Sequence, residues 1–337
     1  MPDTLKTLLL RLARPKCLID LAPGLAIGLV LALTMAMTGM PAMAQDNAGD
    51  VALEDFVGDV PPQFATLEEA VEAFQQALAN DDLTAFAGLI GLDPERLASA
   101  EETAERFAEI QAAAARLLRV DETGQGQQRV AMLAMGDEIW PFPFPLAIND
   151  DRTWSFDTYA GLEEVINRRV GENELQAIAT LRGYVEAQRD YAAADRDSDG
   201  VLEFAGQLVS SPGMTDGLYW PDDLGAGPSP GGAFIDEAEL DNARSQNDGY
   251  FGYRFRILSA QGDNIAGGRY DYVINGNMIA GFGLIAWPVR YAETGVHSFL
   301  VNQAGIVYEK DLGENTAALA DAITAFDPDD SWSLVSD

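Results

Sequence analysis

The residues of this chain whose types and spacing best suit chemistry form one acidic run, Asp195-Arg196-Asp197-Ser198-Asp199-Gly200-Val201-Leu202-Glu203. Carboxylates stand at positions 1, 3 and 5 of this run, and a glycine stands at position 6 for a tight turn. A backbone carbonyl at Val201 and a carboxylate at Glu203 follow, and hard oxygen ligands of this kind suit Ca²⁺. Position 12 is Gly206, so the bidentate glutamate that completes a twelve-residue calcium loop is absent.

The acidic run therefore has two open interpretations. One is a shortened calcium loop, with ligands from Asp195, Asp197, Asp199, Val201 and Glu203. The other is a metal-free acidic turn, because aspartate and glycine are common turn formers. If calcium binds, we expect it to act as a structural clip and not as a catalyst, since nothing nearby marks a nucleophile.

Several other chemistries are excluded by composition. The chain has one cysteine, Cys17, and one histidine, His297. Zinc sites built from cysteine or several histidines, and disulfide scaffolds, are therefore excluded. A Ser-His-Asp hydrolase would need His297 as its base, but no Gly-x-Ser-x-Gly elbow supplies the nucleophile. We expect His297 to be an ordinary polar residue at the end of a strand.

Composition does not exclude carboxylate chemistry, but with 54 acidic residues a close pair is expected by chance, so no catalytic pair can be picked out from the sequence. A carboxylate-dependent hydrolase acting on an envelope polymer is therefore the enzymatic alternative. Its candidate residues are Arg168, Arg169, Glu174 and Asp216. Ion pairs on a helix surface are the competing role for these residues.

The N-terminal segment, 1–44, has the three parts of a secretory signal peptide. Four cationic residues precede an apolar run from Leu25 to Met37, and Ala42-Met43-Ala44 gives the small-x-small pattern before a new N-terminus at Gln45. Cys17 precedes the apolar run, so it is not the lipidated cysteine of a lipoprotein. The alternative is a retained anchor, because the apolar stretch approaches the ~20 residues of a spanning helix. We expect cleavage and a periplasmic or secreted protein without further membrane integration.

The chain is strongly acidic. Loss of the leader removes four basic and two acidic residues and changes the net charge from −33 to −35. This field repels nucleic acid phosphates and anionic lipid headgroups, so neither is an expected partner. Cationic partners or divalent metals suit it better. The acidity has a second explanation, which is that it keeps an exported protein in solution.

Helices are predicted first, after an acidic segment over 45–62 that we expect to be flexible. Thr66 and Glu69 form a capping box for a helix with an apolar stripe from Leu67 to Leu78. A short helix over 83–90 follows. An alanine-rich helix over 101–116 is expected to direct Phe107, Ile110 and Leu117 toward the core.

Strands follow over 117–122 and 129–135, joined by a turn at Gly124-Gln125-Gly126. The segment Trp140-Pro141-Phe142-Pro143-Phe144-Pro145-Leu146 alternates proline with apolar residues, which predicts a strand at a sheet border that resists pairing. Its aromatic side chains suit either a core or a binding platform. A strand over 154–157 closes the sheet. Helices followed by an antiparallel sheet predict an α+β cone like that of nuclear transport factor 2 over 63–158.

The second half, 159–335, is predicted to combine a long helix with antiparallel strands. The helix spans 162–191, with a break at Gly171 and a buried stripe that includes Leu175. A surface loop is expected over 225–232. Strands are predicted over 250–259, 269–274 and 278–287, the last two joined by an Asn275-Gly276 turn, and over 298–302 and 305–309. A closing helix is predicted over 317–326.

Several runs in this half resemble an uncharacterised bacterial family of exported proteins, domain of unknown function 2950, over about residues 62 to 335. The resemblance implies no activity, cofactor or catalytic residue. The runs are Gly171-Glu172-Asn173-Glu174-Leu175, Tyr184-x-x-Ala187-Gln188-x-x-Tyr191, Asp216-Gly-Leu-Tyr-Trp-Pro221, Tyr253-Arg254-Phe255-Arg256-Ile257-Leu258 and Val301-Asn-Gln-x-Gly-x-Val-Tyr-Glu-Lys-Asp-Leu-Gly313.

A second resemblance is to the soluble heads of pilins and type II secretion pseudopilins. It consists of Ala187-Gln188-x-x-Tyr191, Gly252-Tyr253-x-Phe255-Arg256 and Ser298-Phe299-x-Val301-x-Gln303-x-Gly305. Prepilins keep a glutamate at the fifth position of the apolar helix, whereas the fifth position after Gly24 is Leu29 here. The resemblance therefore implies the shape of the C-terminal half and not assembly into a pilus.

Together these observations predict an α+β protein with a cone-like domain followed by a pilin-head-like domain. The function expected of it is non-catalytic binding or scaffolding in the cell envelope, with an envelope protein or polymer as partner. The hydrolase described above and a calcium-stabilised component of an envelope assembly are the alternatives.

Overall fold

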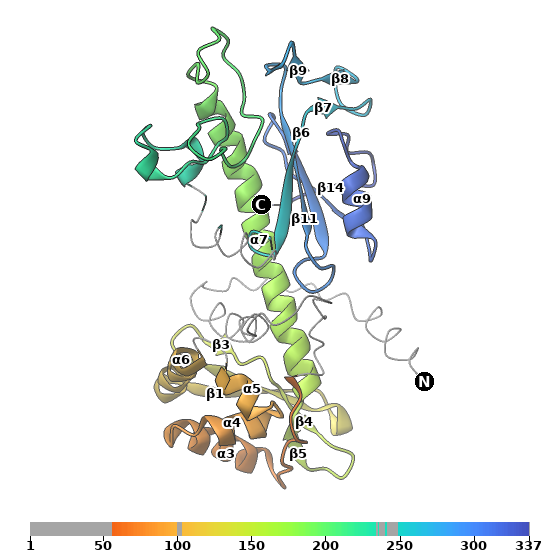
Figure 1. Cartoon of the computed structure of the whole chain (residues 1–337). Coiled ribbons are helices and arrows are strands. Elements are labelled where there is room, and N and C mark those ends of the chain that lie inside the picture. Colours follow the sequence, from red (N-terminus) through yellow and green to blue (C-terminus); the bar gives the residue numbers. More distant parts are fainter. Residues whose placement is uncertain (1–55, 100–102, 234, 236–239, 241–248, 337) are drawn as a thin grey trace, which may run out of the picture. The chain divides into compact units, whose positions relative to one another are not determined.

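The computed structural model describes residues 56–99, 103–233, 235, 240 and 249–336 (Figure 1). The predicted leader, 1–44, and most of the acidic segment, 45–62, lie outside these residues. Contacts divide the chain into two compact units, with the division between Thr158 and Tyr159. No helix in the described part of the chain combines the length and the apolar character of a membrane span.

Helices open the first unit, and the predicted capping box at their start is confirmed. The Thr66 hydroxyl accepts the amide N–H of Glu69 at 3.2 Å, and the Glu69 carboxylate accepts that of Ala65 at 3.0 Å. The first bond satisfies an amide that the first helical turn leaves without a partner, the second holds the residue before the N-cap, and the helix then buries Phe74 and Leu78. The helices are α3 (Leu67–Ala79), α4 (Leu83–Ile90), α5 (Pro94–Ser99) and α6 (Thr103–Arg116).

One prediction for these helices needs correction, and one short helix was not predicted. Phe107 and Ile110 of α6 are buried as expected, but Leu117 is 40% exposed. Because α6 ends at Arg116, Leu117 no longer follows the helical period that predicted its direction. The sequence also gave no signal for α5, a helix of only six residues.

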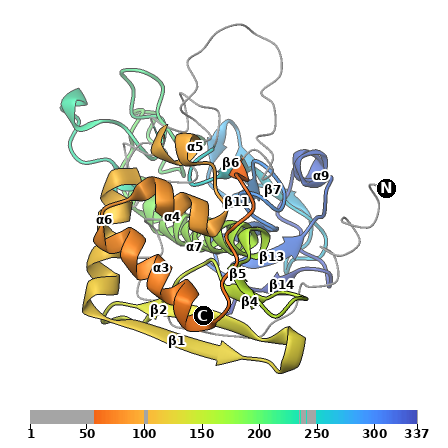
Figure 2. The same cartoon turned by 90° about the horizontal axis from the view of Figure 1, so that it is seen from below.

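The sheet of the first unit is antiparallel, in the order β1-β2-β4-β5, and β3 also pairs with β2. The β1–β2 ladder joins Leu118 to Met135 and Thr123 to Val130, so the hairpin predicted around Gly124-Gln125-Gly126 is confirmed. Figure 2 shows α3, α4 and α6 on one face of this sheet. The elements are β1 (Leu118–Thr123), η2 (Gly126–Gln128), β2 (Val130–Met135), β3 (Trp140–Pro141), β4 (Leu146–Ile148) and β5 (Trp154–Phe156).

The proline-rich segment is not the single border strand that its alternation predicted. It divides into β3 and β4, and β4 pairs with β2 on one side and with β5 on the other. The Phe142 amide continues the pairing by donating to the Leu133 carbonyl at 2.7 Å. The prolines remove donors only at their own positions, so the residues between them and after them still pair.

The aromatic side chains of that segment belong to the core. Trp140, Phe142 and Phe144 are at most 3% exposed. The Phe142 ring lies 5.1 Å from that of Phe74 and 6.0 Å from that of Phe86. Of the two interpretations of these aromatics, the core is therefore confirmed and the binding platform is excluded.

A single helix, α7 (Thr158–Tyr191), runs through 34 residues, and Gly171 does not break it. Its buried residues in the second unit include Ala177, Leu181 and Val185. Leu175, which was predicted to lie on the buried stripe, is 64% exposed. Leu175 stands two residues before the buried Ala177. Two residues correspond to about 200° of rotation around the helix, so Leu175 faces away from the buried stripe.

The main sheet of the second unit has the order β14-β13-β12-β11-β6. Two predicted strands are each divided, 269–274 into β8 and β9 and 278–287 into β10 and β11. The Asn275-Gly276 hairpin between β9 and β10 is confirmed, with φ of 56° and 99°. The strands are β6 (Tyr253–Leu258), β7 (Ala260–Gln261), β8 (Tyr270–Asp271), β9 (Val273–Ile274), β10 (Asn277–Met278), β11 (Gly283–Pro288), β12 (His297–Asn302), β13 (Tyr308–Asp311) and β14 (Ser333–Leu334).

Helices cover both faces of this sheet (Figure 1). Leu284 and Phe299 pack in a cluster with α7, whereas Ile285 and Leu300 pack with Ala320 of α9 (Thr316–Ala322). Alternate strand residues thus serve opposite faces, and every position of β11 is buried. The predicted surface loop over 225–232 follows the short helix η3 (Asp222–Leu224) and runs into a second one, η4 (Pro230–Ala233). Helices and antiparallel sheets together confirm the α+β class.

Candidate functional site

The acidic loop, 195–203, follows α7 and folds around its first carboxylate. Asp195 accepts the amides of Ser198 at 2.8 Å and Gly200 at 3.0 Å. Gly200 has a φ of 85°, which is the left-handed conformation that glycine adopts most easily. Partial desolvation opposes the ionisation of Asp195, but the amides of Gly200 and Ser198 hold its pKa below the usual value. The carboxylate is therefore kept charged.

The loop brings three of the predicted ligands together. Asp195, Asp197 and Asp199 are exposed, and each places a carboxylate oxygen within 4.8 Å of those of the other two. Asp199 also connects the loop to β10, because its carboxylate accepts the side-chain amide of Asn277 at 2.6 Å. Three converging carboxylates suit a hard cation such as Ca²⁺.

The other two predicted ligands are placed differently. The Glu203 carboxylate is outside the group of three and accepts the amide of Met278 at 3.2 Å. Burial raises its pKa, and the charges of the three aspartates raise it further. The Val201 amide donates to Asp199 at 2.7 Å. Glu203 thus experiences the negative charge of the group without belonging to it.

Glu174, a candidate of the hydrolase alternative, lies in a different environment. Its carboxylate accepts the amides of Val296 at 2.8 Å and His297 at 2.9 Å, and it lies 3.2 Å from His297 Nδ1. Burial opposes its ionisation, but the bonds from His297 and Val296 leave the pKa of Glu174 below the usual value. The bond to Glu174 in turn raises the pKa of His297. His297 begins β12 as predicted, but no local pattern indicates its partner, which lies 123 positions away in the chain.

Two further residues of α7 bind the segment just before β12, which also contains the partners of Glu174. Arg169 donates to the Glu293 carbonyl at 2.6 and 3.0 Å, and Asn173 donates to the Thr294 carbonyl at 2.9 Å. Together with the Glu174 bonds, these contacts attach the segment 293–297 to the helix. We name this set of contacts, from Arg169, Asn173 and Glu174 to 293–297, the clasp. Its polar groups are occupied within the protein.

The remaining hydrolase candidates do not join Glu174 in one site. Arg168 forms the predicted ion pair along the helix, with Glu164 at 2.7 Å, and its side chain is partly buried there. Asp216 accepts the amide and the hydroxyl of Ser211, both at 2.8 Å, and closes a turn. Glu174 and Asp216 therefore have no common hydrogen-bond partner among the described residues.

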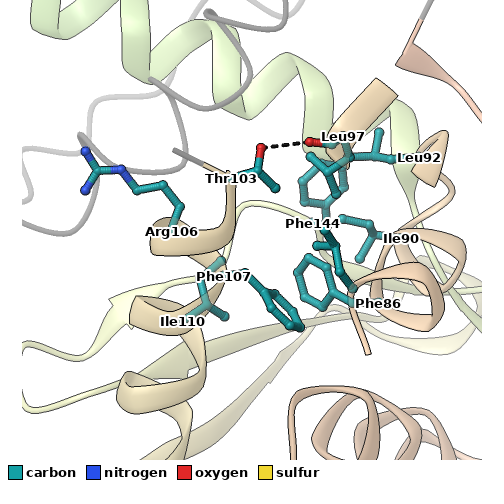
Figure 3. Close-up of a pocket in the computed structure, with 10 residues that line it drawn as sticks. Phe86, Ile90, Leu92, Leu97, Thr103, Arg106, Phe107, Ile110 and Phe144 are labelled. Atoms are coloured by element: carbon teal, nitrogen blue, oxygen red, sulfur yellow. Dashed lines mark hydrogen bonds between the residues drawn. The ribbon is translucent and has the colours of Figure 1, made fainter. Parts of the chain in front are cut away.

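A small cavity in the first unit has a volume of about 20 Å³. Figure 3 shows that its lining is mainly aromatic and aliphatic, that Thr103 donates to the Leu97 carbonyl at its border, and that Arg106 extends away from the rings. This volume is enough for about one water molecule. The cavity is therefore a packing feature and not a ligand site.

A larger groove lies in the second unit, with a volume of about 450 Å³. β7, β8 and α9, which border it, lie on the same side of the main sheet in Figure 1. A volume of this size is in the range of small-ligand sites. The groove is lined by Ala260, Gln261, Gly262, Arg269, Asp271, Leu300, Ala322, Ile323, Thr324, Ala325, Asp327 and Trp332.

The wall of the groove is held in place by its own hydrogen bonds. The buried Gln261 side chain donates to the carbonyls of Ala266 at 3.3 Å and Gly268 at 2.8 Å. Asp327 accepts the amide of Asn264 at 2.8 Å. A Cβ on residue 262 would overlap the Asp327 carboxylate, so a larger residue there would displace this carboxylate from its place. These contacts fix the short β7–β8 hairpin beside α9.

The groove has no local signature in the sequence. Its lining combines residues 260–271 with residues 300 and 322–332, and none of these segments contains a motif with regular spacing. The long-range contact of Gly262 with Asp327 has no local signal. The same holds for the clasp, whose partners are more than a hundred residues apart in the chain.

Comparison with known proteins gives one match. A family model described as "Protein of unknown function (DUF2950)" matches residues 62–335. No curated protein and no solved structure matches the chain. The matched range includes both units, the acidic loop, the clasp and the groove. The chain therefore belongs to the DUF2950 family of proteins of unknown function.

Proposed function

We propose that this protein is an exported, non-catalytic binding module of the cell envelope, and that its ligand occupies the groove between β7, β8 and α9. Export rests on the leader over 1–44, with cleavage near Ala44 and Gln45. The partner is an envelope protein or polymer, or a part of one that enters the groove.

The groove is the observation that carries this proposal. Its volume of about 450 Å³ accommodates a small ligand or a side chain of a larger one. Its lining combines apolar side chains, such as Ile323 and Trp332, with the polar or charged Gln261, Arg269, Asp271, Thr324 and Asp327, and its accessible surface is slightly more polar than apolar. In a binding site the apolar surface gives affinity and the polar groups fix the orientation of the ligand.

The polar clusters elsewhere support binding over catalysis. His297 is the one histidine of the chain, and within the described residues its side chain has Glu174 as its hydrogen-bond partner and no serine, threonine or tyrosine hydroxyl. A nucleophile activated by this histidine would lie within hydrogen-bond reach of the ring. Neither cavity described above is lined by Glu174 or Asp216.

The proposal is tested by measuring the mass of the exported protein and of any ligand bound to it. The full chain is expressed with its leader, recovered from the periplasm and examined by native mass spectrometry. Ala322→Trp fills the groove, and Ala318→Trp makes the same change at an exposed position of α9 outside the lining. We expect a polypeptide that begins at Gln45 and a non-covalent adduct on the wild type and Ala318→Trp but not on Ala322→Trp. An adduct on all three proteins, or on none, would contradict the proposal.

A second function, a calcium clip at the acidic loop, is favoured by the convergence of three carboxylate oxygens within 4.8 Å. Because Asp199 and Glu203 also contact β10, a bound ion would stiffen the connection between the loop and the β9–β10 hairpin. The residues proposed to hold it are Asp195, Asp197 and Asp199, with Val201 and Glu203 as further predicted ligands.

Thermal melts test the clip. A ligand that binds only the native state raises stability by about 2.7 kcal/mol at a concentration of about 100 times its Kd. We expect the melting temperature to rise when ~1 mM Ca²⁺ replaces chelator, and to rise less with Mg²⁺, which demands a stricter geometry. Equal melting temperatures in Ca²⁺ and chelator would exclude the clip.

A further inference from the structure

We infer that the groove binds an alkylammonium group, which is a protonated primary amine on an aliphatic stem. This inference rests on the proposed function and names the ligand class of the same site. Its basis is the combination of unpaired carboxylate oxygens with an aliphatic wall. The source of the group is either a free aliphatic polyamine or the lysine side chain of a peptide, which share this chemistry.

Two carboxylates of the lining have free capacity to accept hydrogen bonds. Asp271 on β8 is exposed, and its carboxylate has no hydrogen bond or ion pair with any residue that the structure describes. Asp327 accepts one backbone amide, from Asn264, on Oδ1. A carboxylate has about four acceptor positions, and an ammonium has three donors, so one ammonium can satisfy several of these positions.

The net charge available to a ligand is negative. Arg269 is the cationic residue of the lining, and its Nε and Nη2 donate to Asp263 at 3.2 and 3.0 Å. Asp263 is not a lining residue, and its carboxylate neutralises the charge of Arg269. The negative charges of Asp271 and Asp327 are therefore not neutralised by Arg269. The whole chain has a net charge of −33, which further favours the approach of a cation.

The apolar wall suits the stem of such a ligand. Leu300 is only 1% exposed, so the apolar surface that a ligand can reach belongs mainly to Ile323, Ala325 and Trp332, which are half-buried. Long amines place their methylene groups along apolar surface and keep the charged end near water or carboxylates. A groove of 450 Å³ accommodates several methylene groups.

Trp332 already has a cationic partner within the protein. Lys310 Nζ lies 5.8 Å from its ring centroid and donates to the Ser331 hydroxyl at 2.6 Å, so the ammonium of the ligand is assigned to the two carboxylates and not to this ring. An anionic ligand would approach two carboxylates of like charge, which is unfavourable.

The inference is tested by NMR titration of the exported, purified protein at low salt, where exposed charges are least screened. The probes are 1,5-diaminopentane, its uncharged analogue 1,5-pentanediol, a lysine-containing tripeptide and glucose. We expect the diamine to shift the amide signals of Gly262 and Thr324, and the diol to leave them unchanged. Preferred binding of the tripeptide would identify a lysine side chain as the source, and preferred binding of the diamine a free polyamine.

Charge variants make the test specific. Asp271→Asn and Asp327→Asn are expected to weaken diamine binding about fivefold each, because each removes a charge-assisted hydrogen bond. Asp150→Asn makes the same change at an exposed residue of the first unit and is expected to have no effect. Diamine binding that survives both groove variants, or equal binding of the diol, would overturn the inference.

The two proposals fail separately. If glucose or the diol shifts the groove amides and the diamine does not, the ligand class is wrong, but the groove remains a binding site. If no probe shifts these amides, the inference is wrong. If, in addition, Ala322→Trp carries the same adduct as Ala318→Trp, the proposed function is wrong too.

Discussion

The clasp and the groove both place carboxylates beside a loop of the second unit, but they differ in how far the protein satisfies them. In the clasp, Glu174 accepts two backbone amides and the His297 ring. In the groove, the carboxylate of Asp271 has no partner among the described residues. The clasp is thus complete as a structural connection, whereas the groove keeps polar groups available for a ligand.

Removal of the clasp carboxylate is expected to have the largest effect on stability. Glu174→Ala leaves the amides of Val296 and His297 without an acceptor, which costs about 3 kcal/mol of unfolding free energy. The control is Glu164→Ala on the same helix, which removes the ion pair between Glu164 and Arg168. For this control we expect a loss of about 0.5 kcal/mol of unfolding free energy. Urea unfolding measures both. Equal losses would show that the clasp is no stronger than a surface pair.

The pH dependence of stability isolates the histidine of the clasp. The raised pKa of His297 means that its stabilisation is present below its usual value of 6.5 and is lost as the pH rises through the folded-state pKa. The lowered pKa of Glu174 means that its contribution is present above 4.5 and is lost as the pH falls through the folded-state pKa.

Their interaction is therefore strongest between about pH 4.5 and 6.5. We expect the stability difference between the wild type and His297→Gln to be largest in this range and to decrease at higher pH. Urea midpoints across the range measure it. A difference that does not change with pH would contradict an ion pair.

Loss of a carboxylate is expected to stabilise the acidic loop in the absence of calcium, whereas loss of Glu174 destabilises the clasp. Asp197→Asn removes one of three like charges that face each other, so the melting temperature in chelator should rise slightly. The same change removes a proposed ligand, so the rise caused by Ca²⁺ should disappear. Melts of the variant and the wild type in chelator and in Ca²⁺ measure both effects. A variant that keeps the full calcium response would exclude Asp197 as a ligand.

The smallest effect on stability is expected in the groove. Asp271→Asn breaks no interaction with a described residue, so its unfolding free energy should lie within about 0.5 kcal/mol of the wild type. Its binding of a diamine should nevertheless weaken. Parallel urea and NMR measurements test this separation of binding from stability. A large loss of stability would mean that Asp271 has a structural role like that of Glu174.

Local patterns in the sequence predicted the elements that depend on local contacts. The capping box at Thr66 and the Asn275-Gly276 hairpin are examples, because their bonds join residues near in the chain. Leu175 and the proline-rich segment were misplaced, since helix rotation and sheet order are set by packing against distant elements. The cone-like and pilin-head-like shapes stay predictions.

The candidate sites follow the same rule. The three aspartates of the acidic loop were found from their spacing, because five consecutive residues bring them together. The bond between Glu174 and His297 joins residues 123 positions apart, and the groove combines segments that come before β11 and after β12 in the chain. Such sites arise from topology, which short motifs do not encode.

The most direct test of a non-catalytic binding module is the fate of its own ligand. The compound released from the wild type is incubated with fresh protein for a day, and its mass is measured before and after. A binding module returns the compound unchanged and binds it again, and Ala322→Trp does not bind it. A product that has gained one water, formed by the wild type but not by Glu174→Ala or by buffer, would contradict the account and establish a hydrolase.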